Sequence, residues 1–459
     1  MAPMKKHIDI LNLEWSSSPG RDRIAATLVC NYLRLCGYVV EEQSVFDGYH
    51  ALNKLQPRLL LMTNTTGAPE NISMMKYAKS RCILGASLIS EGNFTRSAEN
   101  HLEMIWGWNK DRKLLEDLHL QWSKRTLNIT LDLHPELNGR IKVSGGVGFD
   151  NYRIQKNSFD REIFLNSRGL SKYKKIIGIG CFDFGNFYSA DPRYALNEKF
   201  LSPKEIERFQ NDGRAFDTIL TTVANLNKDI LFIARQHPGA LFGHKSSATI
   251  HSEKIPNVIV VKDELSLYDS ISMSDFWMIY ESTTALEAWL LNKQTCLLNP
   301  SGRNFSREVY ISEGSPAYTS ADELNKAIKL FFMKNELPGF KERSLHRSEA
   351  IKNTIQWDDG LNHVRAGNII LDLIESNKEH AALRSETMNE RIKRVKQHLK
   401  WVTSPWLSKI KRHDNSWSNK KNFSTKELEN LSRVKFQEQL DFYKSRGLTL
   451  DQLRQIQSL

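Results

Sequence analysis

Short apolar runs alternate with amphipathic stretches along the first three quarters of the chain. In the N-terminal third the apolar runs predict strands, and stretches with a 3.6-residue apolar period predict helices between them. The expected strands are 7–13, 39–43, 59–62, 82–84, 104–106 and 141–144, and the expected helices are 21–36, 72–79 and 110–118. Such alternation predicts a parallel sheet covered by helices on both faces.

A second series of the same kind follows a polar, basic stretch at 151–175. Its expected strands are 175–180, 230–234, 258–261, 276–280 and 295–298, and its expected helices are 203–225, 267–273, 285–291 and 320–334. We therefore expect an α/β protein with two Rossmann-like domains facing a cleft, at 1–150 and 176–357, joined by the connection 151–175.

The C-terminal part of the chain has only helical patterns. Residues 358–376 are expected to form a closing helix, and 377–459 a basic helical extension with helices at 384–399, 425–445 and 450–457. Ser424 and Thr449 each precede a Glu or Gln by three positions, which is the spacing of a capping box. The extension thus differs in expected structure from the two α/β domains.

The charge of the chain is unevenly distributed. The 459 residues are 40% apolar and 25% charged, and their formal net charge is +11. Twelve Lys or Arg and four acidic residues lie between 378 and 421, so this segment alone carries a net charge of +8. The near balance elsewhere argues against a nucleic-acid channel through the fold. Five scattered cysteines without a Cys-x-x-Cys pair argue against a disulfide framework or a zinc site.

Trp401, Trp406 and Trp417 lie inside this basic segment. Tryptophan beside Lys and Arg is typical of a surface that binds anionic lipid. The alternative is a solvated helical appendage whose aromatic side chains pack on the body of the protein. The sequence shows neither an apolar stretch of membrane-spanning length nor a signal-peptide pattern, which favours a cytoplasmic location. Lipid binding by the basic segment would make that location peripheral at the inner face of the plasma membrane.

Polar clusters follow two apolar runs of the second series. Gln-His-Pro at 236–238 follows 230–234, and Glu-Ser-Thr-Thr at 281–284 follows 276–280. We expect both at the carboxyl ends of neighbouring strands, where such sheets bind ligands. Thr284 and Glu287 have capping-box spacing, and a helix start with free N–H groups attracts phosphate, as does the imidazole of His237. The clusters predict a phosphate clamp; the alternative is a strand-ending turn and an ordinary helix cap.

Several segments resemble one known group of proteins. They are Ile-Ser-Glu-Gly at 89–92, Trp-Gly-Trp at 106–108, Lys-Val-Ser-Gly-Gly-Val-Gly-Phe-Asp at 142–150, the two clusters just described, and Asp-Asp-Gly at 358–360 followed by Arg365. With them, residues 5–376 resemble GT-B glycosyltransferases, and within that fold the bacterial surface carbohydrate and capsule biosynthesis proteins akin to Kdo-transferases and sialyltransferases. Val147 and Gly148 stand where that family has Pro-Arg, and Glu281 where many relatives have Gly or Ser.

The resemblance implies a metal-independent, inverting transfer of a sugar from a CMP- or other nucleotide-linked donor to a growing surface polysaccharide or lipid-linked glycan. The nucleotide sugar is a co-substrate, and no cofactor, metal ion or nucleic acid is expected. The basic segment 378–421 would contact an anionic membrane surface or polysaccharide-assembly proteins. The residues expected to bind the donor are His237, Ser282, Thr283, Thr284, Glu287, Gly180 and Asn186. For Glu287 the alternative is a plain capping role, and for the glycine-rich turn at 178–186 it is a turn without a ligand.

Inverting transfer needs a base that takes the proton of the acceptor hydroxyl. The resemblance places this base in the N-terminal domain, where Glu91 and Asp22 are the candidates and Glu14 is the third. The alternative for each of them is an ordinary loop carboxylate without a catalytic role. His237 is the catalytic candidate on the donor side, because it would stabilise the leaving phosphate.

Two other functions remain open. A sugar-nucleotide epimerase of the UDP-N-acetylglucosamine 2-epimerase type shares the fold and a similar start of the Ser/Thr helix, although it has no need of a basic extension. A non-catalytic subunit of a polysaccharide-synthesis complex would keep the fold without the chemistry, and the missing Pro-Arg favours it.

Overall fold

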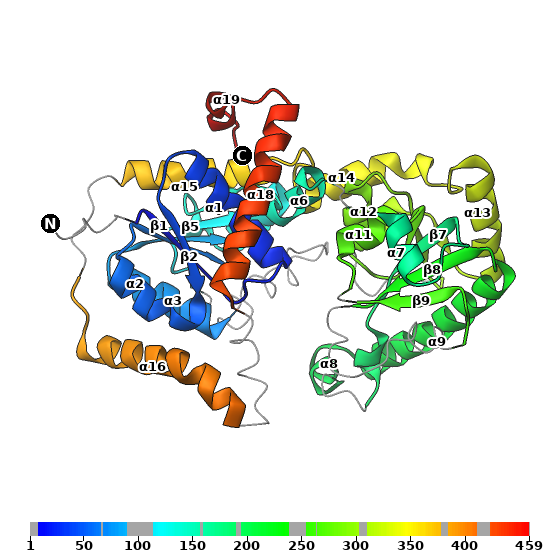
Figure 1. Cartoon of the computed structure of the whole chain (residues 1–459), viewed down its shortest axis with the longest axis horizontal. Helices are drawn as coiled ribbons and strands as arrows, with labels where there is room; N and C mark the ends of the chain where they lie inside the picture. Colours follow the sequence, from blue (N-terminus) through cyan, green and yellow to red (C-terminus); the bar gives the residue numbers. More distant parts are fainter. Residues whose placement is uncertain are drawn as a thin grey trace. The chain divides into compact units, whose positions relative to one another are not determined.

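The computed structural model describes residues 8–65, 68–89, 113–156, 159–189, 194–237, 254–262, 264–302, 310–377, 384–410 and 423–458. The chain divides into two compact units, and each contains one six-stranded parallel sheet (Figure 1). The first unit is built from the described residues up to 155 and from 352 onward, and the second from 156 to 351. The expected closing helix and the basic extension thus belong to the unit of the N-terminal sheet.

The first sheet is buried on both faces. Its strands lie in the order β2 (Val40–Ser44), β1 (Ile10–Glu14), β3 (Leu59–Thr63), β4 (Leu84–Leu88), β5 (Leu118–Gln121) and β6 (Ile141–Val143). Ile10 and its neighbours on one face pack under α1 (Arg21–Leu35) and α15 (Asn362–Ser376). Leu11, which points to the opposite face, packs against α2 (Gly48–Leu55) and α3 (Pro69–Ser80). Burial on both faces requires a continuous apolar run in a central strand such as β3.

The C-terminal helices of this unit pack on its first helix. α18 (Thr425–Ser445) lies against α1, where Gln439 donates a hydrogen bond to the Leu28 carbonyl and Asn31 donates one to the Ser432 carbonyl. The other elements are η1 (Val45–Asp47), α5 (Lys124–Leu133), η2 (Pro135–Leu137), η3 (Val147–Asp150), α6 (Asn151–Ile154), α16 (Met388–Ile410) and α19 (Leu450–Arg454). Among the described residues, no helix combines the length and the apolar composition of a membrane span.

The second sheet has the order β12 (Ala317–Tyr318), β11 (Thr295–Leu298), β10 (Phe276–Ile279), β7 (Lys175–Gly180), β8 (Ile230–Arg235) and β9 (Val258–Val261). Ile177 and its face pack under α9 (Pro203–Leu226) and α13 (Ala321–Lys334). Ile176 and the other face pack under α7 (Arg161–Ser167) and α11 (Leu267–Met273). The remaining elements are η4 (Phe184–Phe187), α8 (Tyr194–Phe200), α12 (Thr284–Leu290), η6 (Tyr310–Gly314), η7 (Lys341–Arg343) and α14 (Ser344–Thr354). Two parallel sheets with flanking helices confirm the expected α/β class.

Some expected elements are wrong. The predicted helix 110–118 is not helical over residues 113–118, and Leu118 instead begins β5, which was not predicted. Leu114, Leu115 and Leu118 have helical spacing, but the alternation of Leu118, His119 and Leu120 is that of a strand. The predicted strand 82–84 begins later, as β4, because Cys82 has a left-handed φ of 61°. The predicted strand 104–106 lies outside the described residues.

Candidate functional site

The order of the strands determines where the second sheet can bind a ligand. From β7 the chain builds β8 and β9 on one side and then crosses to β10 on the other side. Sheets of this kind bind ligands at the carboxyl ends of the two strands where the order reverses. The candidate site therefore lies at the segments that follow β7 and β10, and the segment that follows β8 is next to it. The expectation that the two polar clusters follow neighbouring strands is wrong, because β7 pairs with both β8 and β10.

The segment after β10 is held by a tryptophan of that strand. The Trp277 indole N–H donates to Thr284 Oγ1 at 2.9 Å, and Ser282 Oγ lies 3.0 Å from the same oxygen. Helix α12 begins at Thr284 with Thr283 as its N-cap. The Thr283 side chain makes no capping hydrogen bond, but Ser282 Oγ accepts one from the Thr284 N–H at 3.3 Å. The predicted capping box between Thr284 and Glu287 is therefore wrong, because Trp277 and Ser282 bind the hydroxyl that would have formed it.

Three other residues that were expected to bind the nucleotide-sugar donor lie close to this segment or to β7. A Cβ atom at Gly180 would lie 2.4 Å from Thr284 Oγ1, so packing within the unit already requires glycine there. Asn186 lies in η4, where its carbonyl accepts a hydrogen bond from the Asn197 side chain at 2.7 Å. Glu287 is buried, with 1% of its surface exposed. Their contacts with a nucleotide stay predictions.

His237 follows β8 and is half exposed. Its Nδ1 lies 3.9 Å from Oδ2 of Asp183, whose side chain is only 4% exposed. Asp183 follows β7 and is the N-cap of η4, so it belongs to the segment that flanks the reversal. At this distance the buried carboxylate is an ion-pair partner for the protonated form of the imidazole. Asp183 was not predicted as a site residue, although an acid directly after the central strand was a usable signal.

Arg208 of α9 lies beside Glu281, the residue at odds with a phosphate site. Arg208 Nη2 is 3.7 Å from Glu281 Oε1, and their side chains are 12% and 3% exposed. The guanidinium lies over the Phe209 ring, 4.4 Å from its centre. Among the residues that the structure describes, Nε and Nη2 of Arg208 have no hydrogen-bond partner. Arg208 thus offsets the charge of Glu281 and keeps donors for an anion.

An aromatic cluster fixes the segment after β7. Phe182 and Phe184 lie 5.1 and 4.9 Å from the ring of Tyr280, and Phe187 stacks on Phe209 at 4.3 Å. The Tyr280 hydroxyl donates to Asp212 of α9 at 2.5 Å. Rings packed in this way bring the backbone of the segment against α9, which carries Arg208.

In the first sheet the order reverses between β1 and β3, and Glu14 ends β1. Its Oε1 accepts hydrogen bonds from the Thr63 N–H at 2.9 Å and from Asn12 at 3.1 Å, and its Oε2 lies 2.5 Å from Thr63 Oγ1. Burial raises the pKa of Glu14 to about 7, although Arg23 and these hydrogen bonds favour the charged form. A carboxyl group with such a pKa suits proton transfer, but this one is enclosed by its partners.

The other two candidates for the base differ in what the structure describes. Asp22 lies in the first turn of α1 and is partly exposed, and its charge contributes to the raised pKa of Glu14. Glu91 lies outside the described residues. The assignment of the base therefore stays a prediction.

The resemblance segments at 142–150 and 358–360 meet at the start of α15. Asp150 Oδ2 accepts hydrogen bonds from the His363 N–H at 2.6 Å and from its Nδ1 at 2.8 Å, and Oδ1 accepts one from Asn362 at 2.9 Å. His363 Nε2 in turn bonds the Tyr443 hydroxyl of α18. Asp359 pairs with Arg365 at 2.6 Å. These segments form a buried junction that caps the closing helix.

Gly148, which replaces the arginine of the family pattern, lies against another arginine. A Cβ atom at Gly148 would lie 2.7 Å from Cγ of Arg21, and the Arg21 guanidinium lies 5.0 Å from the centre of the Phe149 ring. A guanidinium is therefore present beside this segment, although it comes from α1. Sequence reasoning missed it because Arg21 and Gly148 are far apart along the chain.

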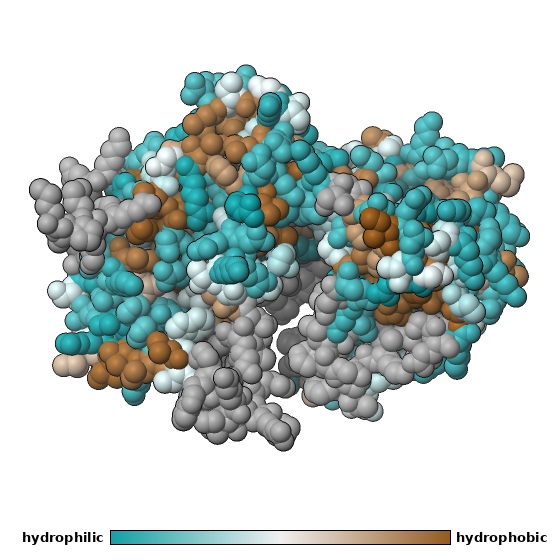
Figure 2. Space-filling view, viewed as in Figure 1, coloured by the Kyte–Doolittle hydropathy of each residue, from teal (hydrophilic) through white to brown (hydrophobic). Residues whose placement is uncertain are grey.

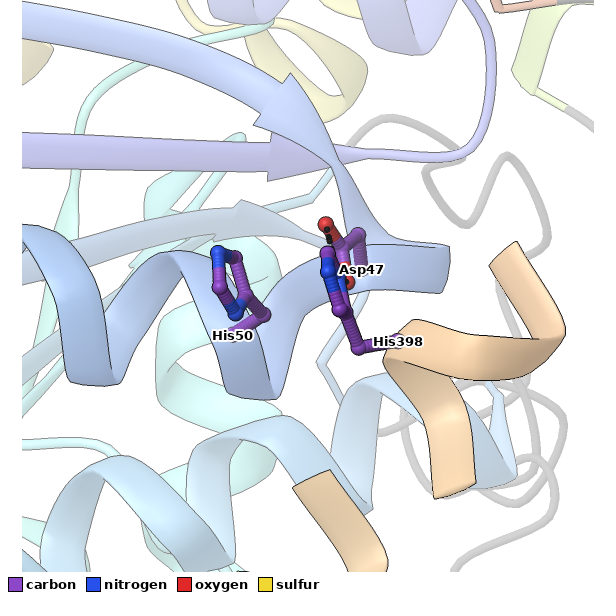
Figure 3. Close-up of side chains that lie close together, drawn as sticks. All are labelled: Asp47, His50 and His398. Carbon is purple, nitrogen blue, oxygen red and sulfur yellow. Dashed lines mark hydrogen bonds and ion pairs between the residues drawn. The ribbon is translucent and has the colours of Figure 1, made fainter. Parts of the chain in front are cut away.

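Asp47, His50 and His398 form the group of described residues whose ligand atoms, within 4.8 Å of one another, could hold a metal ion (Figure 3). His398 Nδ1 already pairs with Asp47 at 3.0 Å, and the two imidazole rings stack at 3.9 Å with an angle of 15°. Stacked rings hold their lone pairs in separate planes, so joint coordination would require one ring to turn. We interpret the group as a contact between α2 and α16, and metal independence stays a prediction.

Comparisons with known proteins identify the fold of this chain but not its family. No family model matches the sequence, and no curated protein matches it. A structure described as a UDP-N-acetylglucosamine 2-epimerase from Listeria monocytogenes has 10% identity and a TM-score of 0.54, covering 82% of this chain and 100% of its own. S. aureus MnaA, solved with UDP, has 12% identity and a TM-score of 0.52 over 82% and 100% of the chains. UDP-GlcNAc 2-epimerase from Neisseria meningitidis, bound to UDP-GlcNAc, has 11% identity and a TM-score of 0.50 over 81% and 100%.

At such identities the likeness concerns the fold alone. Together with the two six-stranded parallel sheets, it shows that this chain has the two-domain α/β GT-B fold. Function has to be argued from the site, because one fold hosts many reactions.

Proposed function

We propose that this chain is a GT-B glycosyltransferase, which transfers a sugar from a nucleotide-sugar donor to a growing surface polysaccharide or lipid-linked glycan of a capsule or lipopolysaccharide. The observation that carries the proposal is the set of groups around the reversal of the second sheet. His237 is half exposed and partnered by buried Asp183, and Arg208 lies beside the segment that follows β10. Cations and N–H donors are what a nucleotide phosphate needs as a leaving group, because negative charge develops on it.

Each group then has a defined role. The acceptor oxygen attacks the anomeric carbon, and the bond from that carbon to the phosphate oxygen breaks with inversion. His237 and Arg208 stabilise the released phosphate, and the hydroxyls of Ser282 and Thr283 bind it. The proton of the acceptor hydroxyl passes to a carboxylate of the first unit, for which Asp22 and Glu91 are the candidates.

Nucleotide binding tests the donor site directly. A ligand that binds only the folded state raises its stability by RT ln(1 + [L]/Kd), so a thermal-shift series with UDP, CDP, CMP and GDP identifies the base. UDP is the first choice, because fold neighbours were solved with UDP and with UDP-GlcNAc. We expect one nucleotide to raise the melting temperature, and His237→Ala to reduce that rise while the exposed control His346→Ala does not. No rise with any nucleotide would contradict the assignment.

A second candidate function is suggested by the fold neighbours that are epimerases. Incubation with nucleotide sugars alone separates the two, since an epimerase turns over without an acceptor and a transferase does not. A non-catalytic subunit would instead keep its function in cells after His237→Ala. Our proposal includes the cytoplasmic, membrane-peripheral location expected from the sequence.

A further inference from the structure

One face of α16 is fixed to the first unit by polar contacts. Glu386, just before the helix, accepts hydrogen bonds from the Tyr77 hydroxyl at 2.5 Å and from Arg394 at 2.9 Å. Glu390 accepts one from Ser80 at 2.7 Å. Tyr77 and Ser80 belong to α3, so the first turns of α16 are seated on that helix.

Further along, the same face of α16 contacts η1 and α2. The Tyr49 N–H donates to Gln397 at 3.1 Å, and His398 pairs with Asp47 and stacks on His50 (Figure 3). Trp401 packs against the apolar cluster under α2 and α3. The expectation that Trp401 lies at a lipid surface is therefore wrong, because its ring is used to seat the helix on the unit.

The opposite face of α16 carries an exposed apolar stripe. Its residues are Met388, Ile392, Val395, Leu399 and Val402, which are 70%, 43%, 43%, 58% and 59% exposed. Their spacing of four and three residues places them in one row along a helix. Figure 2 shows the stripe as a brown patch over α16, at the lower left of the view. Among the described residues of the unit, no contact buries this apolar row.

Positive charge borders this stripe. At 3.6 residues per turn, Arg391 lies on one side of it and Lys396 and Lys400 on the other, and all three are exposed. Within Met388–Ile410 the sequence contains six Lys or Arg and a single acid, Glu390, which is bonded to Ser80. A second copy of α16 laid along the stripe would bring like charges together. An anionic surface meets these cations without repulsion.

We propose that the exposed face of α16, defined by the stripe and its bordering cations, binds an anionic lipid surface. The helix would lie in the plane of the membrane, with the stripe at the boundary between headgroups and acyl chains and the lysines at the phosphates. A helix that lies in the membrane plane in this way attaches the protein peripherally and reversibly. This inference names the surface behind the membrane-peripheral location of the proposed function. It uses none of the residues of the nucleotide site, so vesicle binding and nucleotide binding are tested separately.

Sedimentation of the full-length chain with lipid vesicles tests the proposal. We expect binding to vesicles of phosphatidylcholine with phosphatidylglycerol, little binding to phosphatidylcholine alone, and weaker binding at high salt. The double variant Val395→Glu/Leu399→Glu should lower the partition coefficient roughly tenfold or more, the effect of keeping one large apolar side chain in water. Lys396→Gln and Lys400→Gln should each lower it about fivefold, which corresponds to ~1 kcal/mol per cation.

The matched control is Leu345→Glu, which changes a leucine that is 76% exposed on α14 of the second unit and should leave vesicle binding unchanged. Circular dichroism and melting temperature verify that all variants fold. The proposal is overturned if the wild-type chain does not bind vesicles that contain phosphatidylglycerol, or if the double variant binds them as strongly as the wild type. It is also overturned if light scattering shows that the double variant only converts a dimer to a monomer.

Discussion

Replacing Glu14 by Gln tests whether folding holds this carboxyl group in its neutral form. Burial raises the pKa of Glu14 from 4.5 to about 7, so between these values the folded state keeps a proton that the unfolded state has released. The associated stability is fully present below pH 4.5 and is lost as the pH rises through 7. At 1.36 kcal/mol per pKa unit the loss is about 1 kcal/mol at pH 5 and on the order of 3 kcal/mol at pH 8.

Glutamine avoids this loss because it is neutral at every pH. Its Oε1 can accept the hydrogen bonds from Thr63 and Asn12, and its amide can donate to Thr63 Oγ1, which lies 2.5 Å from Glu14 Oε2. Glu14→Gln is therefore expected to stabilise the first unit at pH 8 by up to roughly 3 kcal/mol and to have less effect at pH 5.

Amide hydrogen exchange in β1 and β3 is the appropriate measurement, because two units need not unfold in one step. The exposed carboxyl group of Glu429 on α18 provides the control, and Glu429→Gln should not change the exchange of these strands. If Glu14→Gln destabilises β1 at pH 8, folding does not raise the pKa of Glu14 and the ionised carboxylate is favourable in the folded state. Its three hydrogen bonds and Arg23 would then outweigh burial, and the reasoning would be refuted.

The remaining predictions concern the donor site and the metal. His237→Ala is expected to lower kcat/KM about 10- to 100-fold, which is the effect of one lost charged hydrogen bond. The control His346→Ala should leave kcat/KM unchanged. Equal values of kcat/KM for the two variants would show that His237 is not part of the site. Arg208→Ala should raise KM for the nucleotide sugar, and Arg208→Lys should restore part of the affinity; an unchanged KM in steady-state kinetics would show that Arg208 does not contact the donor. Activity should persist in excess EDTA and in His398→Ala, and a full loss in EDTA would disprove metal independence.

The pattern of apolar runs was sufficient to predict the α/β class. A strand that is buried on both faces leaves a continuous apolar run in the sequence, as in β7, which has its predicted bounds. The order of the strands leaves no such trace. It depends on which way each crossover turns, so β8 and β10 were expected to be neighbours although β7 separates them. Ser282 and His237 were identified, but Asp183, on the segment between them in space, was not.

The partners of side chains were the least predictable feature. In the sequence, the charge of Glu281 opposes phosphate binding, and only the fold brings Arg208 of α9 to within 3.7 Å of it. Thr284 has the spacing of a capping residue, yet the indole of Trp277 binds its hydroxyl. Trp401 has the surroundings of a lipid anchor in the sequence, yet it packs inward. In each case the local sequence pattern gave a wrong prediction, because only the tertiary structure brings the partner group close to the residue.

The reversals of the two sheets carry groups of opposite chemical character. The β1 and β3 ends hold carboxyl groups, with Glu14 at a pKa of about 7 and Asp22 in the helix that follows β1. At the second sheet, His237 after β8 and Arg208 of α9 lie beside the buried acids Asp183 and Glu281 of the segments that follow β7 and β10. A protein that uses this fold only as a scaffold gains nothing from burying Glu14 or the pair of Arg208 and Glu281, since each burial costs desolvation. Glycosyl transfer needs both kinds, because one substrate loses a proton while the other releases a phosphate, and this favours an enzyme over a scaffold.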